Sequence, residues 1–228
     1  MRALTTISRI LVGVLFIISG FIKANDPLGF SYKLDEYFVV FHTEWMSVVS
    51  LYLSMFICVF EVGLGFALLL GAKIRAVAWS LLLMIIFFSF LTFYSAYFDV
   101  VKDCGCFGDA LHLTPWQSFT KDAVLVVLIL IIFINKKNIS PLLGDKTSNL
   151  VAYTFLLISF FFTLYCYRHL PVIDFRPYAV GKNLMEGMQL PPNAKQTITE
   201  MVFIYEKDGK KIELKPDRKS TRLNSSHR

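Results

Sequence analysis

Two cysteines one residue apart are the side chains of this sequence best suited to chemistry. Cys104 and Cys106 flank Gly105 in a polar stretch between two long apolar runs. Such a pair forms a disulfide only if the backbone bends to bring the Cα atoms within about 7 Å, and Gly105 and Gly108 permit that bend. A small strained ring is more oxidising than a structural bridge. The spacing therefore predicts a redox-active pair, in which one cysteine takes part in attack and the other resolves the mixed disulfide.

Three other interpretations of the pair stay open. Asp103, Asp109 and His112 lie near the thiols and could complete a metal site, although paired zinc ligands usually have two or more residues between them. The pair could also be a static disulfide that ties the loop, or two unpaired packing cysteines. The aspartates disfavour a thiolate, and Lys102 is the local cation, with Lys23 at the same level. We favour the redox pair and assign no metal.

The elements around the pair are predicted to be membrane spans. The 228 residues are 55% hydrophobic and only 18% charged, which is less charge than a soluble domain carries. A helix needs about 20 apolar residues to cross the hydrocarbon. The net charge of +6 is explained by basic residues that flank the spans, not by nucleic-acid binding. Five runs qualify, at about 7–24, 46–70, 74–98, 115–135 and 150–167.

Local signals set the limits of two spans. Thr114, Pro115 and Gln117 form a helix-start signature that joins the cysteine loop directly to the fourth span. Asp26-Pro27 ends the first helix, because proline cannot continue it. Residues 28–45 are then either a short amphipathic piece on the membrane surface or an ordinary loop.

Polar residues inside the first two spans need partners. Glu61 is a carboxylic acid at membrane depth, so it is a proton or ion site, part of a structural pair with a base such as Arg9, or a protonated group hydrogen-bonded to a neighbour. In the first span, Gly13 and Gly20 share a helical face with Arg9 and Lys23, and small residues let another helix approach closely.

Other polar side chains and thiols have plainer interpretations. Ser89, Thr92 and Ser95 form a strip in the third span, for which we expect helix–helix hydrogen bonds. Cys58 is expected to be a small buried hydrophobe. Cys166, at the far end of the fifth span, is a third candidate participant in thiol exchange.

Basic residues predict the orientation. Positive charge in short loops stays in the cytoplasm, which places the N-terminus inside and the cysteine loop and the C-terminus outside, where disulfides form. We therefore expect a multi-pass protein of the bacterial inner membrane. One side holds Arg2, Arg9, Lys73, Arg75, Lys136, Lys137 and Lys146; the other holds Lys23, Lys33, Lys102 and Lys121.

The predicted domain division has four parts. Residues 1–135 form a four-helix membrane core, and 136–167 form a cytoplasmic turn and a fifth helix. Residues 168–216 are an extracytoplasmic segment in which 201–214 predicts a β-hairpin. Residues 217–228 resemble a translated sequencing adapter, so we treat them as an artefact and expect the natural chain to continue with the rest of a domain.

Three patterns resemble a known family. Glu61 followed by Gly63 and Gly65 is similar to the second helix of DoxX-like membrane proteins, and Cys104-Gly105-Cys106-Phe107-Gly108 resembles the MauE branch, linked to methylamine utilisation. The resemblance covers about residues 5–135. The first helix also resembles that of DoxX-like proteins, through Arg9, Gly13, Phe16, Ser19, Gly20, Lys23, Asp26 and Pro27.

The resemblance implies an all-α, DoxX-like four-helix membrane bundle. MauE-like members are regarded as helping to mature methylamine dehydrogenase, and DoxX-like members are associated with respiratory quinol oxidation. By position, Cys104 and Cys106 become the catalytic redox pair, while Lys23 and Glu61 become core polar residues. The fifth span and the tail depart from the family, so the partner need not be methylamine dehydrogenase.

We therefore predict a membrane thiol–disulfide redox or maturation factor that acts on an extracytoplasmic protein partner. No haem or flavin motif is present, and a membrane quinone is the cofactor considered. The alternatives are a non-enzymatic scaffold or respiratory-complex subunit and, more weakly, a small transporter lined by Glu61. The predicted site has Cys104 and Cys106 as catalytic residues, supported by Gly105, Gly108, Lys23, Glu61 and Cys166.

Overall fold

A computed structural model describes residues 2–101, 108–111, 113–175, 183, 203–207 and 210–214 of the chain. They belong to two compact units, residues 1–182 and 183–228, and each unit is described by itself. The helices of the first unit are α1 (Arg2–Asn25), α2 (Pro27–Val40), α3 (Ser50–Leu70), α4 (Ile74–Phe98), α5 (Pro115–Ile134) and α6 (Asp145–Arg168), with short 3₁₀ turns η1 (Glu44–Val49), η2 (Gly108–Ala110) and η3 (Lys136–Asn138).

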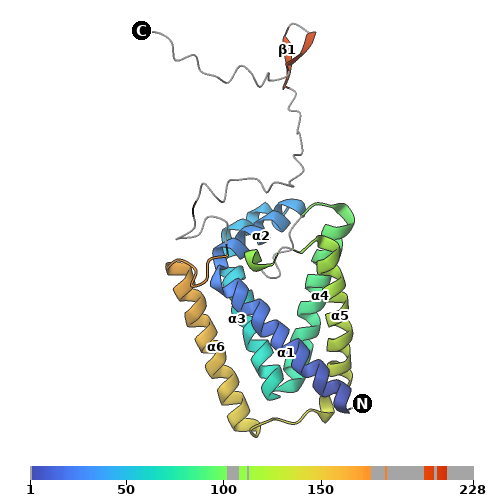
Figure 1. Cartoon of the computed structure of the whole chain (residues 1–228), viewed down its shortest axis with the longest axis vertical. Coiled ribbons are helices and arrows are strands. Elements are labelled where there is room, and N and C mark those ends of the chain that lie inside the picture. Colours follow the sequence, from blue (N-terminus) through green and yellow to red (C-terminus); the bar gives the residue numbers. More distant parts are fainter. Residues whose placement is uncertain are drawn as a thin grey trace. The chain divides into compact units, whose positions relative to one another are not determined.

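Five helices of the described residues are long and apolar enough to cross a membrane. They are α1, α3 with the preceding η1, α4, α5 and α6 (Figure 1). The five predicted spans are therefore confirmed, and the chain is a multi-pass α-helical membrane protein. The first and last helices differ most from their predicted limits: α1 begins at Arg2 and α6 at Asp145, whereas the apolar runs begin near residues 7 and 150, because the polar first turn of a helix has no hydrophobic signal.

Four of these helices share one apolar core. Figure 1 shows α4 beside α5, with α1 crossing α3 next to them. Lipid tails are as apolar as leucine, so close packing rather than water exclusion must stabilise this contact. The buried members are Val12 and Phe16 of α1, Leu64 and Leu68 of α3, Val77, Leu81 and Ile85 of α4, and Leu125, Ile129 and Ile132 of α5.

Glycines bring the backbones of α1 and α3 into contact. A Cβ atom added at Gly20 would lie 2.6 Å from the Cγ2 atom of Val62, and one at Gly65 would lie 2.9 Å from the carbonyl oxygen of Gly13. Real Cβ atoms do not approach other atoms so closely, so only glycine fits at these crossings. The predicted close approach along the glycine face of the first helix is confirmed.

Helix α6 packs on α3 outside the shared core. Figure 1 shows it on the opposite side of α1 and α3 from α4 and α5. The rings of Phe66 and Phe155 stack with centroids 3.9 Å apart. Beyond α6, the side chain of Asn25 donates to the carbonyl oxygen of Ile173 at 2.6 Å and accepts from the backbone N–H of Ile173 at 3.1 Å. These two bonds tie the segment after α6 to the end of α1.

The connection after the first span is a helix, so its interpretation as an ordinary loop is wrong. Asp26 caps α2 by accepting a hydrogen bond from the backbone N–H of Gly29 at 2.9 Å, and Pro27 occupies the first helical turn. Phe30, Leu34 and Tyr37 form its buried side, and Figure 1 shows α2 across one end of the bundle. The Asp-Pro pair thus ends one helix and also begins the next.

The second unit has a two-stranded antiparallel sheet among its described residues. Strand β1 (Phe203–Lys207) pairs with β2 (Lys210–Leu214), with Phe203 opposite Leu214 and Lys207 opposite Lys210.

Candidate functional site

An ion pair lies buried between α1 and α3. The Nζ atom of Lys23 contacts the Oε2 atom of Glu61, and the two side chains are only 2% and 7% exposed. The rings of Phe30 and Phe88 face the same ammonium, with centroids 5.2 and 5.1 Å from it. A charge at this depth is expensive unless it is paired, so each partner accounts for the presence of the other.

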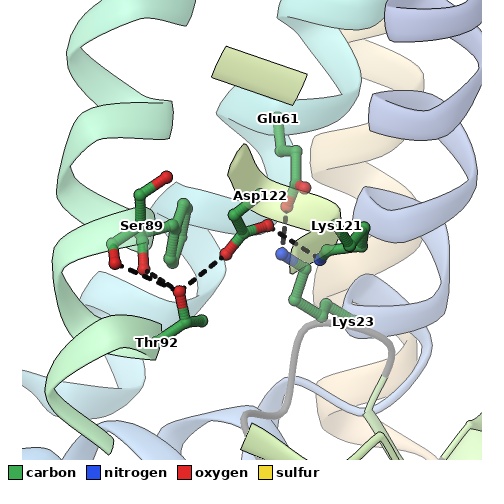
Figure 2. Close-up of polar contacts among 7 residues, drawn as sticks. Lys23, Glu61, Ser89, Thr92, Lys121 and Asp122 are labelled. Carbon is green, nitrogen blue, oxygen red and sulfur yellow. Dashed lines mark hydrogen bonds and ion pairs between the residues drawn. The ribbon is translucent and has the colours of Figure 1, made fainter. Parts of the chain in front are cut away.

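A second charged pair lies on α5, and its carboxylate bonds to α4. The Nζ atom of Lys121 lies 3.1 Å from Oδ1 of Asp122. The other carboxylate oxygen of Asp122 is 3.1 Å from the hydroxyl of Thr92, which donates to it across the helix interface. Asp122 is 2% exposed, while Lys121 is partly exposed. Figure 2 shows this set beside the Lys23–Glu61 pair.

Both pairs line one small cavity. Its volume is about 30 Å³, and Ser19 lies in its wall with the four charged residues. That volume corresponds to about one water molecule. In the described part of the chain, no group of three or more histidine, cysteine or acidic side chains could hold a metal ion. Two ammonium groups and two carboxylates around one water-sized space are suited to holding and passing protons between helices.

Glu61 pairs with Lys23 and not with Arg9, which corrects the pairing suggested by the sequence. Arg9 donates from Nε to the carbonyl oxygen of Leu68 at 2.8 Å and from Nη2 to that of Leu69 at 2.7 Å. These carbonyls belong to the last turn of α3, where the helix leaves acceptors unsatisfied. Arg9 lies about 21 Å from Lys23 along α1, so it meets the other end of α3.

Two members of the hydroxyl strip of α4, Thr92 and Ser95, make the helix–helix hydrogen bonds that were predicted. Thr92 bonds to Asp122 of α5, and the hydroxyl of Ser95 lies 3.2 Å from that of Tyr37 in α2. The prediction is wrong for Ser89: its backbone carbonyl accepts from the Thr92 hydroxyl within α4 at 3.2 Å, and its own hydroxyl is buried with no hydrogen-bond partner among the described residues. The strip therefore joins α4 to two different neighbours.

The predicted catalytic residues Cys104 and Cys106 and the intervening Gly105 lie outside the described residues, as do Asp103 and His112 of the metal alternative. The chain on both sides of them is described. Val101 is 2% exposed and packs with Tyr37 and Leu91. These contacts hold the chain against α2 and α4 just before the cysteine segment.

On the other side of the segment, Gly108 has a φ of +50°, a conformation that glycine adopts without strain. A Cβ atom added there would lie 3.7 Å from Ile22 of α1. The predicted capping box then starts α5: Thr114 accepts from the backbone N–H of Gln117, and the Gln117 side chain accepts from the backbone N–H of Thr114. That prediction is confirmed.

The two described cysteines are free and buried. Cys58 is fully buried in α3 against Ala24, Phe30 and Leu34, which confirms it as a small packing residue. Cys166 is 4% exposed in the last turns of α6. Its participation in thiol exchange stays a prediction.

The membrane core matches a known protein family. A family model described as "Methylamine utilisation protein MauE" matches residues 1–135. The chain belongs to the MauE family. It is also 26% identical over 155 residues to "Protein TlpB" of Flavobacterium psychrophilum, an alignment that covers 63% of this chain and 42% of that protein. The chain thus spans about two fifths of the length of this relative. No solved structure matches it.

The MauE match coincides with the charged site. It ends at the end of α5 and so includes α1, α3, α4 and α5, which carry Lys23, Glu61, Thr92, Lys121 and Asp122. Helix α6 lies beyond the matched residues. The charged pairs are therefore part of the segment that this chain shares with the MauE family.

The sequence reasoning assigned no role to Asp122, although it is the most buried carboxylate of the site. A signal was present: an adjacent Lys-Asp pair near the start of an apolar span predicts an inward-facing group with a partner. Thr92 was included only as a member of the hydroxyl strip. Its pairing with Asp122 depends on how α4 and α5 are rotated, which the strip alone does not indicate.

Proposed function

We propose that this MauE-family chain is a membrane-embedded thiol–disulfide redox or maturation factor, with Cys104 and Cys106 as the exchanging pair. The observation that carries the proposal is how the chain is held on either side of the pair. Val101 is buried against α2 and α4, and Gly108 lies beside Ile22, the neighbour of Lys23 in α1. The pair therefore belongs to a segment attached at both ends to the part of the bundle that holds the ion pairs.

The proposed step is a disulfide exchange. A thiolate of the partner protein attacks one sulfur of the Cys104–Cys106 disulfide, which breaks that bond and forms a mixed disulfide. The second partner thiolate then attacks the partner's own sulfur in the mixed bond. The partner gains a disulfide, and this chain becomes a dithiol that holds the two electrons and, after protonation, two protons. Exchange with a second protein disulfide returns the pair to its oxidised form.

Lys23 and Glu61 are proposed to support this exchange by holding the end of α1 next to the cysteine segment in place. The end of α1 leads from Lys23 to Asn25, which binds the segment after α6. The buried ion pair fixes that end against α3, so the surroundings of Gly108 are held in place. Cys166, near the outer end of α6, is proposed as a third participant: its thiolate attacks the partner's sulfur in the mixed disulfide, which releases the sulfur of the pair as a thiolate and leaves the partner bonded to Cys166.

A membrane quinone is not given a step in this proposal. The exchange above balances with protein disulfides alone, and a membrane quinone stays the cofactor considered from the sequence.

The same proposal places the protein in the bacterial inner membrane, with the N-terminus in the cytoplasm. The cysteine segment and the β-containing tail then lie on the oxidising side. The partner is an extracytoplasmic protein with exchangeable cysteines, of the kind that methylamine utilisation requires. Membership of the MauE family supports this assignment.

Thiol labelling in native membranes tests the proposal. We expect a mass-tagged maleimide to modify Cys104 and Cys106 only after reductant, in a Cys58→Ser/Cys166→Ser background that removes the two buried thiols. The Cys106→Ala variant should retain a mixed disulfide with an extracytoplasmic protein, whereas Cys104→Ser/Cys106→Ser should retain none.

The proposal is wrong if both cysteines remain thiols in oxidised membranes and Cys106→Ala traps no protein. A chain whose activity survives Cys104→Ser/Cys106→Ser but is lost when residues 183–216 are removed would instead be a scaffold that acts through its tail.

A further inference from the structure

The end of the bundle farthest from the cysteine segment has a basic depression with one acidic side chain among its described lining residues. The α3–α4 turn contributes Lys73 and Arg75, the α5–α6 turn contributes Lys136 and Lys137, and Asp145 is the acidic residue in the lining. The depression has a volume of about 850 Å³. Four cations face one carboxylate, so the depression is complementary in charge to an anion.

Aromatic rings, not carboxylates, contact two of these cations. The Nζ atom of Lys136 lies 3.4 Å from the ring centroid of Phe133 and 5.6 Å from that of Trp79. The Nζ atom of Lys73 donates to the hydroxyl of Tyr153 at 2.6 Å. Such contacts orient an ammonium group and leave its charge uncompensated. Trp79 and Tyr153 also suit the level of the lipid head groups.

An apolar groove continues from this depression between α3, α4 and α6. Its volume is about 190 Å³. Lys73 and Ala76 line both the groove and the depression, so the two spaces meet at these residues. The other apolar residues of the groove wall are Phe60, Gly63, Leu64, Ala67, Ala72, Val77, Ala152 and Leu156.

We propose that the depression and the groove together bind one anionic phospholipid. The phosphate lies among Lys73, Arg75 and Lys137, and one acyl chain enters the groove past Ala76. The groove opens between membrane-spanning helices, where the surrounding solvent is lipid. Basic pockets between spans at the head-group level bind anionic lipids through the same combination of charge and apolar contact. A soluble anion would use the depression but not the groove.

Lipid retention by the purified full-length chain tests this site. The chain is exchanged into phosphatidylcholine nanodiscs with and without phosphatidylglycerol, and retained lipid is counted by native mass spectrometry after release into detergent. We expect one phosphatidylglycerol to be retained in preference to phosphatidylcholine. Each of Arg75→Gln and Lys137→Gln should weaken retention about fivefold.

Two further variants separate a specific site from general attraction. Lys146→Gln removes a charge from the first turn of α6 that is not part of the depression, so retention should not change. Ala76→Phe fills the junction with the groove while leaving every charge in place, and it should abolish retention. Ala76 is exposed, so the fold should tolerate this change; thermal unfolding in phosphatidylcholine micelles checks it.

Three results would overturn the proposal. They are equal loss of retention in Lys146→Gln and Lys137→Gln, full retention in Ala76→Phe, and complete displacement of the retained phosphatidylglycerol by inorganic phosphate. The first would indicate a diffuse basic surface, and the other two would indicate a free-anion site.

Discussion

The two charged regions of this bundle differ in how their cationic side chains are neutralised. Inside the bundle, Lys23 and Lys121 each contact a carboxylate. At the α3–α4 and α5–α6 turns, Lys136 lies over aromatic rings, and four cations share one acidic neighbour. The hydrocarbon supplies no counter-ion, so charge there must be neutralised by the protein itself. At the head groups the surroundings supply anions, so a surplus can persist.

Breaking the buried pair on one side should have the largest effect. Glu61→Leu leaves Lys23 as an uncompensated buried charge, and we expect a loss of about 3–5 kcal/mol in the free energy of unfolding. Unfolding in mixed micelles with increasing denaturing detergent measures it. The double variant Lys23→Met/Glu61→Leu removes both charges and should recover most of the loss. Equal losses of stability in the single and double variants would show that Lys23 and Glu61 do not compensate each other's buried charge.

Removing the hydroxyl that binds Asp122 should have a smaller effect. Thr92→Val keeps the shape of the side chain but loses a hydrogen bond to a charged group, which contributes about 1.5–3 kcal/mol. The same micelle titration measures the change. Thr120→Val is the matched control, because Thr120 is exposed and bonds only to the carbonyl of its own helix at Trp116. Similar losses in the two variants would contradict an interior role for Asp122.

Removing a turn cation should have the smallest effect on the protein alone. Lys137→Gln is expected to leave the melting temperature in phosphatidylcholine micelles unchanged, since no carboxylate loses its partner. Adding phosphatidylglycerol should raise the melting temperature of the unmodified chain more than that of the variant, because a ligand stabilises the state that binds it. A lower melting temperature of the variant without anionic lipid would remove the contrast between the two regions.

Hydrophobic length alone was enough to predict the five membrane helices. The second and third predicted spans, 46–70 and 74–98, agree closely with Glu44–Leu70 and Ile74–Phe98. Helix α2 was not predicted with the same clarity, because its buried side is short and its start at Asp26-Pro27 is also a helix-stop signal. Local signals could not decide between these two functions of one dipeptide.

Partners of the buried charges were harder to predict. Glu61 was predicted to need a partner, but the base that the sequence suggested was Arg9, whereas the partner is Lys23. The crossing of α1 and α3 at Gly20 and Gly65 decides the matter, because it sets which level of one helix faces which level of the other. Asp122 depends in the same way on the packing of α4 against α5.

The sequence by itself determined that this chain spans a membrane, where α5 begins, and that Glu61 needs a partner, because these follow from solvation and from local hydrogen bonding. The tertiary structure alone decided that Lys23 is that counter-charge, that Asp122 and Thr92 join the same site, and that the basic turns meet a groove at Lys73 and Ala76. These outcomes depend on the depth and rotation at which separate helices meet, and no single helix carries that information.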